Sequence, residues 1–192
     1  MNTILKLGIA STLLLGMSPA VADAKTPTQA VTPYYKWNGY SGNSYQFVLD
    51  KDFKRALLNS NVTVNGMKAT KPKKNFDDNQ SFNAYNFYTE FNILNAQYLT
   101  KKFDTIGIKE DKKYYVVKMP VQKNKISYNQ IKKMYGKYTL GEGQMGDSEL
   151  NQFYEQSLAI KTKTGQAQFM FNKKEMLTHI YFIGDRNLEM GY

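Results

Sequence analysis

The sequence contains no cysteine and only one histidine, and these two shortages exclude several kinds of site. Without thiols the chain cannot be held together by disulfides, and a zinc site of the cysteine type is excluded. A single histidine, His179, cannot build a multi-histidine metal centre. Stability must therefore come from packing, for which the 14% aromatic content supplies bulky side chains. We expect no metal and no cofactor.

Enzyme motifs are missing as well. No G-x-S-x-G elbow is present, and GEGQMG at 141–146 lacks the Gly-Lys-Ser/Thr that completes a phosphate-binding loop. His179 alternates with Leu177 and Tyr181 in a strand-like pattern, where a lone histidine is more often a packed or surface residue than a base. We therefore predict that the protein is not an enzyme, and no residue is assigned a catalytic role.

A long hydrophobic run is absent after the first two dozen residues, and those residues have the features of a secretory signal peptide. Lys6 gives a positive start, 7–17 is mostly apolar but too short to span a bilayer, and small-x-small cleavage patterns occur at 20–22 and 22–24. The chain is therefore predicted to be secreted or extracellular, with attachment to the cell surface left open, and to have no transmembrane segment. Its predicted parts are a signal peptide (1–24), a flexible N-terminal stub (25–33) and a single domain (34–192).

What the sequence has in excess is lysine. The net charge is +10, with 26 basic and 16 acidic residues, and only Arg55 and Arg186 are arginines. Residues 101–137 carry eleven lysines and three acids, whereas 138–192 is net acidic. A concentrated positive charge on an exported protein favours polyanionic partners such as nucleic acid, anionic wall polymer or acidic lipid. The alternative is that the lysines only keep the surface soluble.

Local patterns in the first half predict a strand, a short helix and a hairpin. Tyr45, Phe47 and Leu49 alternate as in a strand. Asp50 is a plausible N-cap for a helix that continues to about residue 58. VTVNGMKA, at 62–69, contains the Asn-Gly pair typical of a tight hairpin. Residues 71–79 are predicted to form a loop, and 81–99 a helix weakened by its asparagines.

The second half predicts one strand, one helix, a glycine loop and three further strands. KKYYVVKM, at 112–119, is typical of a strand, and Ser127 with Gln130 forms the capping box of a helix over 127–135. Residues 139–148 are interpreted as a glycine-rich loop. The three strands are predicted at 151–159, 165–171 and 177–183. Together the elements indicate an α+β fold, a mostly antiparallel sheet with two or three helices packed on one face.

The candidate binding residues follow from the charge count. Lysine suits diffuse contact with phosphates, whereas the scarcity of arginine argues against bidentate reading of bases. Any binding to nucleic acid should therefore tolerate changes of sequence and depend strongly on salt. The predicted nucleic-acid-binding residues are Lys101, Lys102, Lys112, Lys113, Tyr114, Tyr115, Lys123, Lys125, Lys132, Lys133 and Lys137.

The opening of the domain also resembles a known family. TPYYKWNGYSGN, then FVLDKDF and NVTVNGMK, resembles the immunodominant staphylococcal antigen B family, and a later IS…I.K.YGK piece is similar too. The matching positions are Thr32 to Tyr35, Asn38 to Tyr40, Gly42-Asn43, Phe47 to Lys51, Phe53, Asn61 to Lys68, Ile126, Ser127, Ile131, Lys133 and Tyr135 to Lys137. The match is close in the N-terminal third and looser in the C-terminal half.

The resemblance implies a secreted or surface-associated, non-enzymatic antigen that binds extracellular DNA or RNA with little sequence preference. It carries no residue-level binding motif, so the lysines above rest on charge alone. Two other classes stay open. One is a surface module that binds a host protein, and the other is a binder of anionic wall polymer or lipid headgroups.

Overall fold

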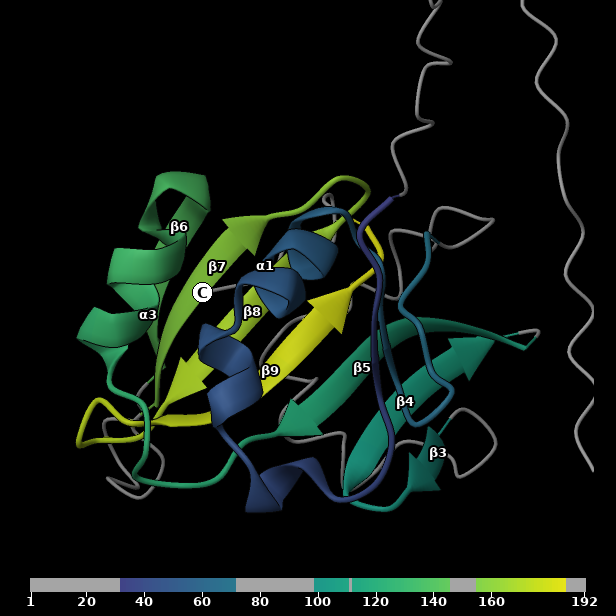
Figure 1. Ribbon diagram of the computed structural model, residues 1–192, viewed down its shortest axis with the longest axis horizontal. Helices are drawn as coiled ribbons and strands as arrows, with labels where there is room; N and C mark the ends of the chain where they lie inside the picture. The colour runs from purple at the N-terminus through teal and green to yellow at the C-terminus, as the bar shows by residue number, and fades with distance from the viewer. Residues whose placement is uncertain (1–31, 72–98, 111, 146–154, 186–192) are drawn as a thin grey trace, which may run out of the picture. The chain divides into compact units, whose positions relative to one another are not determined.

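A seven-stranded antiparallel sheet forms the centre of the structure, a computed structural model that describes residues 32–71, 99–110, 112–145 and 155–185 (Figure 1). The strand order is β3-β4-β5-β9-β8-β7-β6. Their bounds, in the order in which they lie in the sheet, are β3 (Leu99–Lys102), β4 (Thr105–Glu110), β5 (Lys113–Pro120), β9 (Leu177–Ile183), β8 (Gln166–Phe171), β7 (Glu155–Lys161) and β6 (Thr139–Met145). The predicted signal peptide (1–24) lies outside the described residues, as do most of the predicted stub at 25–33, the predicted loop at 71–79 except Lys71, and the predicted helix at 81–99 except Leu99, which belongs to β3.

Two helices, α1 (Lys51–Leu58) and α3 (Tyr128–Tyr135), lie on the same face of this sheet (Figure 1). The contact is made by aromatic rings. The ring centroids of Tyr135 and Phe169 (β8) are 4.8 Å apart, and those of Phe53 (α1) and Phe182 (β9) are 6.5 Å apart. The buried core includes these rings together with Ile131, all with essentially no exposure except Phe182. The α+β prediction, with an antiparallel sheet covered by helices on one face, is confirmed.

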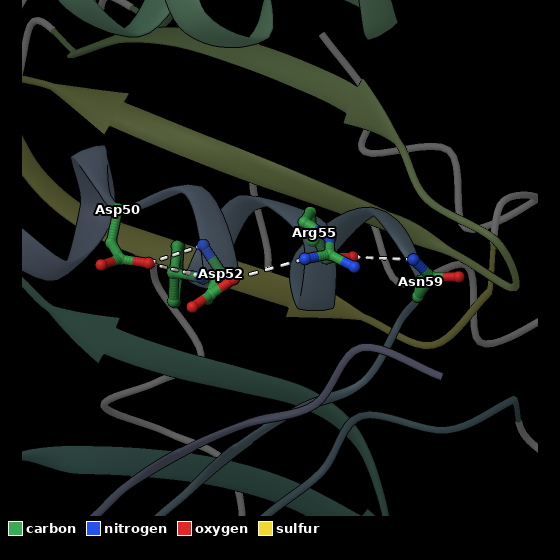
Figure 2. A network of polar contacts seen from close by, with 5 residues as sticks. Asp50, Asp52, Arg55 and Asn59 are labelled. Atoms are coloured by element: carbon green, nitrogen blue, oxygen red, sulfur yellow. Dashed lines mark hydrogen bonds and ion pairs between the residues drawn. The ribbon is translucent and has the colours of Figure 1, made fainter. Parts of the chain in front are cut away.

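Helix α1 starts where the sequence predicts it. The Asp50 carboxylate accepts hydrogen bonds from the backbone N–H groups of Asp52 and Phe53, at 2.6 and 3.1 Å, so two of the donors left free by the first turn are satisfied. Figure 2 shows this cap, together with the Arg55–Asp52 ion pair at 3.6 Å and the Asn59 amide that donates to the Arg55 carbonyl at 2.8 Å. The last contact closes the C-terminal end of the helix.

Helix α3 also begins as predicted, with a complete capping box. The Ser127 hydroxyl accepts from the Gln130 backbone N–H, and the Gln130 side chain accepts from the Ser127 N–H. Its apolar face buries Tyr128, Ile131 and Tyr135, and the helix ends at Gly136. Both helices are thus specified by local signals, a cap followed by apolar residues at helical spacing.

A short parallel pair joins the N-terminal segment to the rest of the structure. β1 (Tyr35–Trp37) pairs with β2 (Val62–Val64), which follows α1. The chain then turns at Asn65 and Gly66, both with positive φ (52° and 85°), and Val64 bonds Met67 across the turn. The Asn-Gly turn is therefore confirmed, but only a bridge rather than a second strand follows it.

The predicted strand at residues 45–49 is wrong. Residues 45–49 do not form a strand, because Gln46–Leu49 is a 3₁₀ turn (η2) that follows another at Ser41–Asn43 (η1). Phe47 and Val48 are both buried beneath the chain's turn into α1, and neighbouring side chains of a strand could not both face one core. The turn brings both side chains inward, which explains why the apolar pattern was misread.

The predicted glycine loop at 139–148 is also wrong for Thr139–Met145, which form β6, the edge strand beside β7. Gly141 pairs with Ala159 and Gly143 with Ser157, so the two glycines lie on the same face of the strand. β3 and β4 were not predicted. The strands β5, β8 and β9 are confirmed, and β7 is confirmed from Glu155 onward.

Candidate nucleic-acid interface

The predicted lysines do not gather in one place, because they belong to four separate parts of the fold. Lys101 and Lys102 are exposed on the edge strand β3, and the 112–113 pair sits at the turn between β4 and β5. Lys123 and Lys125 occupy the loop from β5 to α3. The remaining three, Lys132, Lys133 and Lys137, are exposed on α3 and the 3₁₀ turn η4 (Gly136–Tyr138) that follows it.

The α3 lysines lie beside the opposite edge of the sheet from β3, over β8 and β6. One of them is already matched by an acid: Lys132 Nζ lies 3.1 Å from Glu142 of β6. This contact raises the pKa of Lys132, and the nearby Tyr128 hydroxyl and Lys132 ammonium lower the pKa of the Glu142 carboxyl. Lys132 is therefore a poorer phosphate ligand than its exposure suggests. Lys137 lies 4.9 Å from the centre of the Tyr138 ring.

The two predicted tyrosines contribute to packing. Tyr115 is buried, and it falls at the register shift between β4 and β5, where β5 places one more residue than β4. Tyr114 is half-buried against the core, and a Cβ at Gly107 would come within 2.6 Å of its ring. The close approach of this ring thus requires a glycine at position 107 in β4.

One end of the sheet collects lysines from three loops that are far apart in the sequence. These loops are the β3–β4 turn taken with the last two residues of β3, the exit from β5 and the β8–β9 turn, which share an end because β5 and β8 both lie antiparallel to β9. We call this surface the lysine end. Its exposed lysines are Lys101, Lys102, Lys123, Lys125, Lys173 and Lys174.

Aromatic and small residues of the N-terminal segment 40–45 tie these loops together. Asp104 of the β3–β4 turn accepts hydrogen bonds from the Ser41 and Gly42 backbone N–H groups, at 3.1 and 2.6 Å. The Gln122 N–H donates to the Ser44 carbonyl at 2.9 Å, and Lys125 Nζ lies 5.9 Å from the Tyr45 ring centre. The loops of the lysine end are therefore held in a fixed arrangement.

The β8–β9 turn joins the same surface through α3. The Tyr128 N–H donates to the Glu175 carbonyl at 2.8 Å, and Ser127 bridges Met176. Two acids, Asp104 and Glu175, lie within the loops that carry the six lysines. The Asp104 carboxylate is occupied by backbone donors, so within these three loops the lysines outnumber the free carboxylates.

The other predicted pair, Lys112 and Lys113, lies at the opposite end of the sheet. Lys161 and Lys163 of the β7–β8 turn lie at that end too, because β8 starts where β5 starts.

The sequence did not predict Lys173 and Lys174 as binding residues, because they fall in a net acidic segment. The signal that would have found them is the pairing of β9 with β5, which no local pattern reveals.

The described part of the chain holds no group of three or more histidine, cysteine or carboxylate side chains that could bind a metal ion. Among the same residues, no helix is long and apolar enough to cross a membrane. His179 is buried in β9, where its Nδ1 lies 2.8 Å from the Thr178 hydroxyl and its ring packs edge-on against Tyr181. This is the environment of a packed histidine.

Comparison with known proteins gives one consistent result. Residues 34–182 match the family model described as immunodominant staphylococcal antigen B. Proteins of that name from Staphylococcus aureus strains USA300, NCTC 8325 / PS 47 and N315 are each 33% identical to this chain over 165 residues. The match covers 82% of this chain and 83% of each relative. No solved structure matches.

Proposed function

Because the chain belongs to the immunodominant staphylococcal antigen B family, we propose that it is an exported, non-enzymatic protein that binds extracellular DNA or RNA with little sequence preference. The observation that carries the proposal is the lysine end, where three loops bring six exposed lysines to one end of the sheet. A polyanion that lies across this end would meet ammonium groups from all three loops.

The chemistry of these side chains favours phosphates over bases. A lysine ammonium is a compact point charge with rotatable donors, and it does not provide the planar fork with which arginine reads a base edge. Among the described residues the one arginine is Arg55, which is paired with Asp52 on α1. Binding through the lysine end would therefore distinguish poorly between sequences.

Charge also sets how the binding should depend on salt. Each phosphate neutralised on a duplex releases condensed counterions. A plot of the logarithm of the binding constant against the logarithm of the salt concentration therefore has a slope of about −0.9 for each phosphate contact. Six contacts would give a slope of about −5 for duplex DNA. A gel shift of the mature chain with duplexes of unrelated sequence, repeated over a salt series, measures this slope.

A matched pair of variants locates the site. In the first, Lys102, Lys123, Lys125 and Lys173 are changed to glutamine; in the second, Lys112, Lys113, Lys161 and Lys163 are. All eight are exposed and each variant loses four charges, so net charge is equal in the two. The first should reduce the steepness of the salt slope by about 3 to 4, and the second by less than 1. Equal losses would contradict the lysine end as the site.

Further binding measurements distinguish the rival functions. A module that binds a host protein should hold its partner at high salt and fail when a compact apolar patch is changed. A binder of anionic lipid headgroups should sediment with anionic vesicles and ignore neutral ones. A wild-type chain that shifts no nucleic acid at low salt would overturn the proposed function.

A further inference from the structure

Two exposed aromatic rings from distant parts of the sequence meet at the lysine end. Tyr40 precedes η1, and Phe103 lies in the turn between β3 and β4, 63 positions later in the chain. Their ring centroids are 5.2 Å apart with an interplanar angle of 75°. Tyr40 is 59% exposed and Phe103 is 45% exposed, so the pair is presented to solvent rather than to the core.

The backbone at Phe103 has a conformation that a bulky residue rarely adopts. Phe103 has φ of 56°, in a two-residue turn where glycine would be the unstrained choice. A phenylalanine here gives no core packing in return, because nearly half of its surface is exposed. An unfavourable backbone conformation held by its surroundings is typical of a functional position.

Polar side chains hold the backbone on both sides of each ring. The buried Asn65 bonds Gly39, which precedes Tyr40: its Oδ1 accepts from the Gly39 N–H at 2.7 Å, and its Nδ2 lies 3.1 Å from the Gly39 carbonyl oxygen. The same Nδ2 lies 3.3 Å from the carbonyl oxygen of Lys102, the residue before Phe103.

Asp104 joins the same two segments on the C-terminal side of the two rings. It follows Phe103 directly and accepts from the backbone N–H groups of Ser41 and Gly42, which follow Tyr40. The two chain segments are therefore fastened to each other immediately before and immediately after the two rings. The rings are pre-organised, so little conformational freedom is lost when a ligand contacts them.

We propose that Tyr40 and Phe103 form a stacking site for unpaired bases, which gives the protein a preference for single-stranded over duplex nucleic acid. The inference rests on the proposed function and assigns its substrate class. The occupant is argued from charge: the exposed Lys101 and Lys102 directly precede Phe103 and would contact the phosphates on either side of a stacked base. Every base has a flat face that can stack on an aromatic ring, so such a site tolerates changes of sequence.

A duplex cannot use this site without cost. Its bases are stacked on one another, and withdrawing one from the stack requires unpairing. The lysines, in contrast, serve duplex and single strand alike. Loss of the rings should therefore weaken binding to single strands alone, whereas loss of lysines should weaken both.

The test compares Tyr40→Ser/Phe103→Gly with Tyr34→Ser. Glycine at position 103 relieves the positive φ, so the variant is designed to fold. Tyr34 is a matched control, 54% exposed but before β1 and away from the lysine end. Affinity for an oligothymidylate and for a duplex of equal length is measured at one salt concentration, and thermal unfolding followed by the fluorescence of Trp37, the sole tryptophan, checks the fold.

The double variant should lose tenfold or more in affinity for the single strand and less than twofold for the duplex. Tyr34→Ser should change neither. Unchanged single-strand affinity, or equal losses on both ligands, would overturn the stacking site while leaving the proposed function intact. A wild-type chain that binds neither ligand would overturn both.

A crosslinking experiment gives a readout independent of affinity. An oligonucleotide that carries 5-iodouracil is irradiated in complex with the wild-type chain, and the attached residue is identified by mass spectrometry. Attachment at Tyr40 or Phe103 is expected. Attachment confined to Tyr34, Tyr114 or Tyr138 would overturn the assignment, because these rings lie outside the pair.

Discussion

The hydroxyl of Tyr135 donates a hydrogen bond to the carbonyl oxygen of Val48 at a distance of 2.6 Å, with both residues fully buried. The bond joins the last residue of α3 to the 3₁₀ turn that leads into α1, 87 positions earlier in the chain. Nearby, Lys54 of α1 donates to the Met134 carbonyl oxygen at 2.5 Å. The two helices on the sheet are therefore joined by buried and half-buried polar contacts as well as by apolar packing.

Tyr135→Phe tests the first of these contacts. The change removes the donor and leaves the Val48 carbonyl buried without its partner, which should lower the free energy of unfolding by about 1–3 kcal/mol. Urea unfolding followed by circular dichroism measures the loss. Tyr138→Phe, on the half-buried residue three positions later, is the control and should change the midpoint little. Equal midpoints for wild type and Tyr135→Phe would contradict the prediction.

The same tyrosine should make the fold sensitive to alkali. Burial, with a smaller contribution from Asp50, raises the pKa of Tyr135 far above its ordinary value of 10.0. Above about pH 10 the unfolded chain loses this proton while the folded chain keeps it, so stability falls as pH rises, by about 1.4 kcal/mol per pH unit for one such group.

Chemical unfolding at pH 9 to 11 measures this slope. Tyr135→Phe should show a shallower decline than wild type over that interval. Some slope should persist, because burial also raises the pKa of Tyr35. Parallel profiles for the two proteins would show that Tyr135 does not resist ionisation.

His179 should make the stability of the fold depend on pH in the acid range. Burial, followed by the charge of Lys118, lowers the pKa of His179 well below its ordinary value of 6.5. The contribution of the neutral imidazole to stability is complete above pH 6.5. It is lost as pH falls toward the folded-state pKa, because the unfolded chain gains a proton that the folded chain does not, at about 1.4 kcal/mol per pH unit.

Comparison of His179→Gln with wild type isolates this effect. The difference in the free energy of unfolding between the two should shrink as pH falls from 7 to 5, since carboxylates titrate equally in both. Guanidinium unfolding at several pH values measures it. A difference that stays constant across the interval would contradict the prediction.

Asn65 is predicted to be a stability determinant because of its amide rather than its turn conformation. Its side chain is 2% exposed and reaches Gly39, Lys102 and the Thr105 hydroxyl, the last at 2.8 Å. Asn65→Gly keeps the positive φ easily but removes these bonds, so it should lower the free energy of unfolding by about 2–3 kcal/mol. Gly66→Asn, in the same turn but exposed, is the control for disturbance of the turn itself. If Asn65→Gly leaves the free energy of unfolding unchanged, the hydrogen bonds from Asn65 to the segments that carry Tyr40 and Phe103 do not stabilise the fold.

The elements that the sequence predicts well are those with local signals. Asp50 and Ser127 mark helix starts because a capping side chain acts within three residues, and the apolar, β-branched and aromatic residues of β5, β8 and β9 are visible within each strand. β6 was missed because its glycines resemble a loop, and β3 was missed because two of its four residues are exposed lysines. Both are edge strands, where the demand for buried side chains is weakest.

The candidate site could be predicted only in part, for a different reason. The lysine excess is evident from composition, and Lys101, Lys102, Lys123 and Lys125 were among the predicted residues. Their grouping with Lys173 and Lys174 depends on β9 lying between β5 and β8, which is a fact of topology. The Tyr40–Phe103 pair depends on hydrogen bonds made by Asn65 and Asp104 between segments far apart in the chain.

The position of β9 also has a consequence for the order in which the protein can assemble. β9 is the last described strand in the chain, yet it is the strand that unites β3-β4-β5 with β8-β7-β6. A chain delivered from its N-terminus, as by a ribosome or a translocation channel, can form α1 and single hairpins early. It cannot unite the two parts of the sheet until residues 177–183 have emerged, so the lysine end comes into being only at the final step.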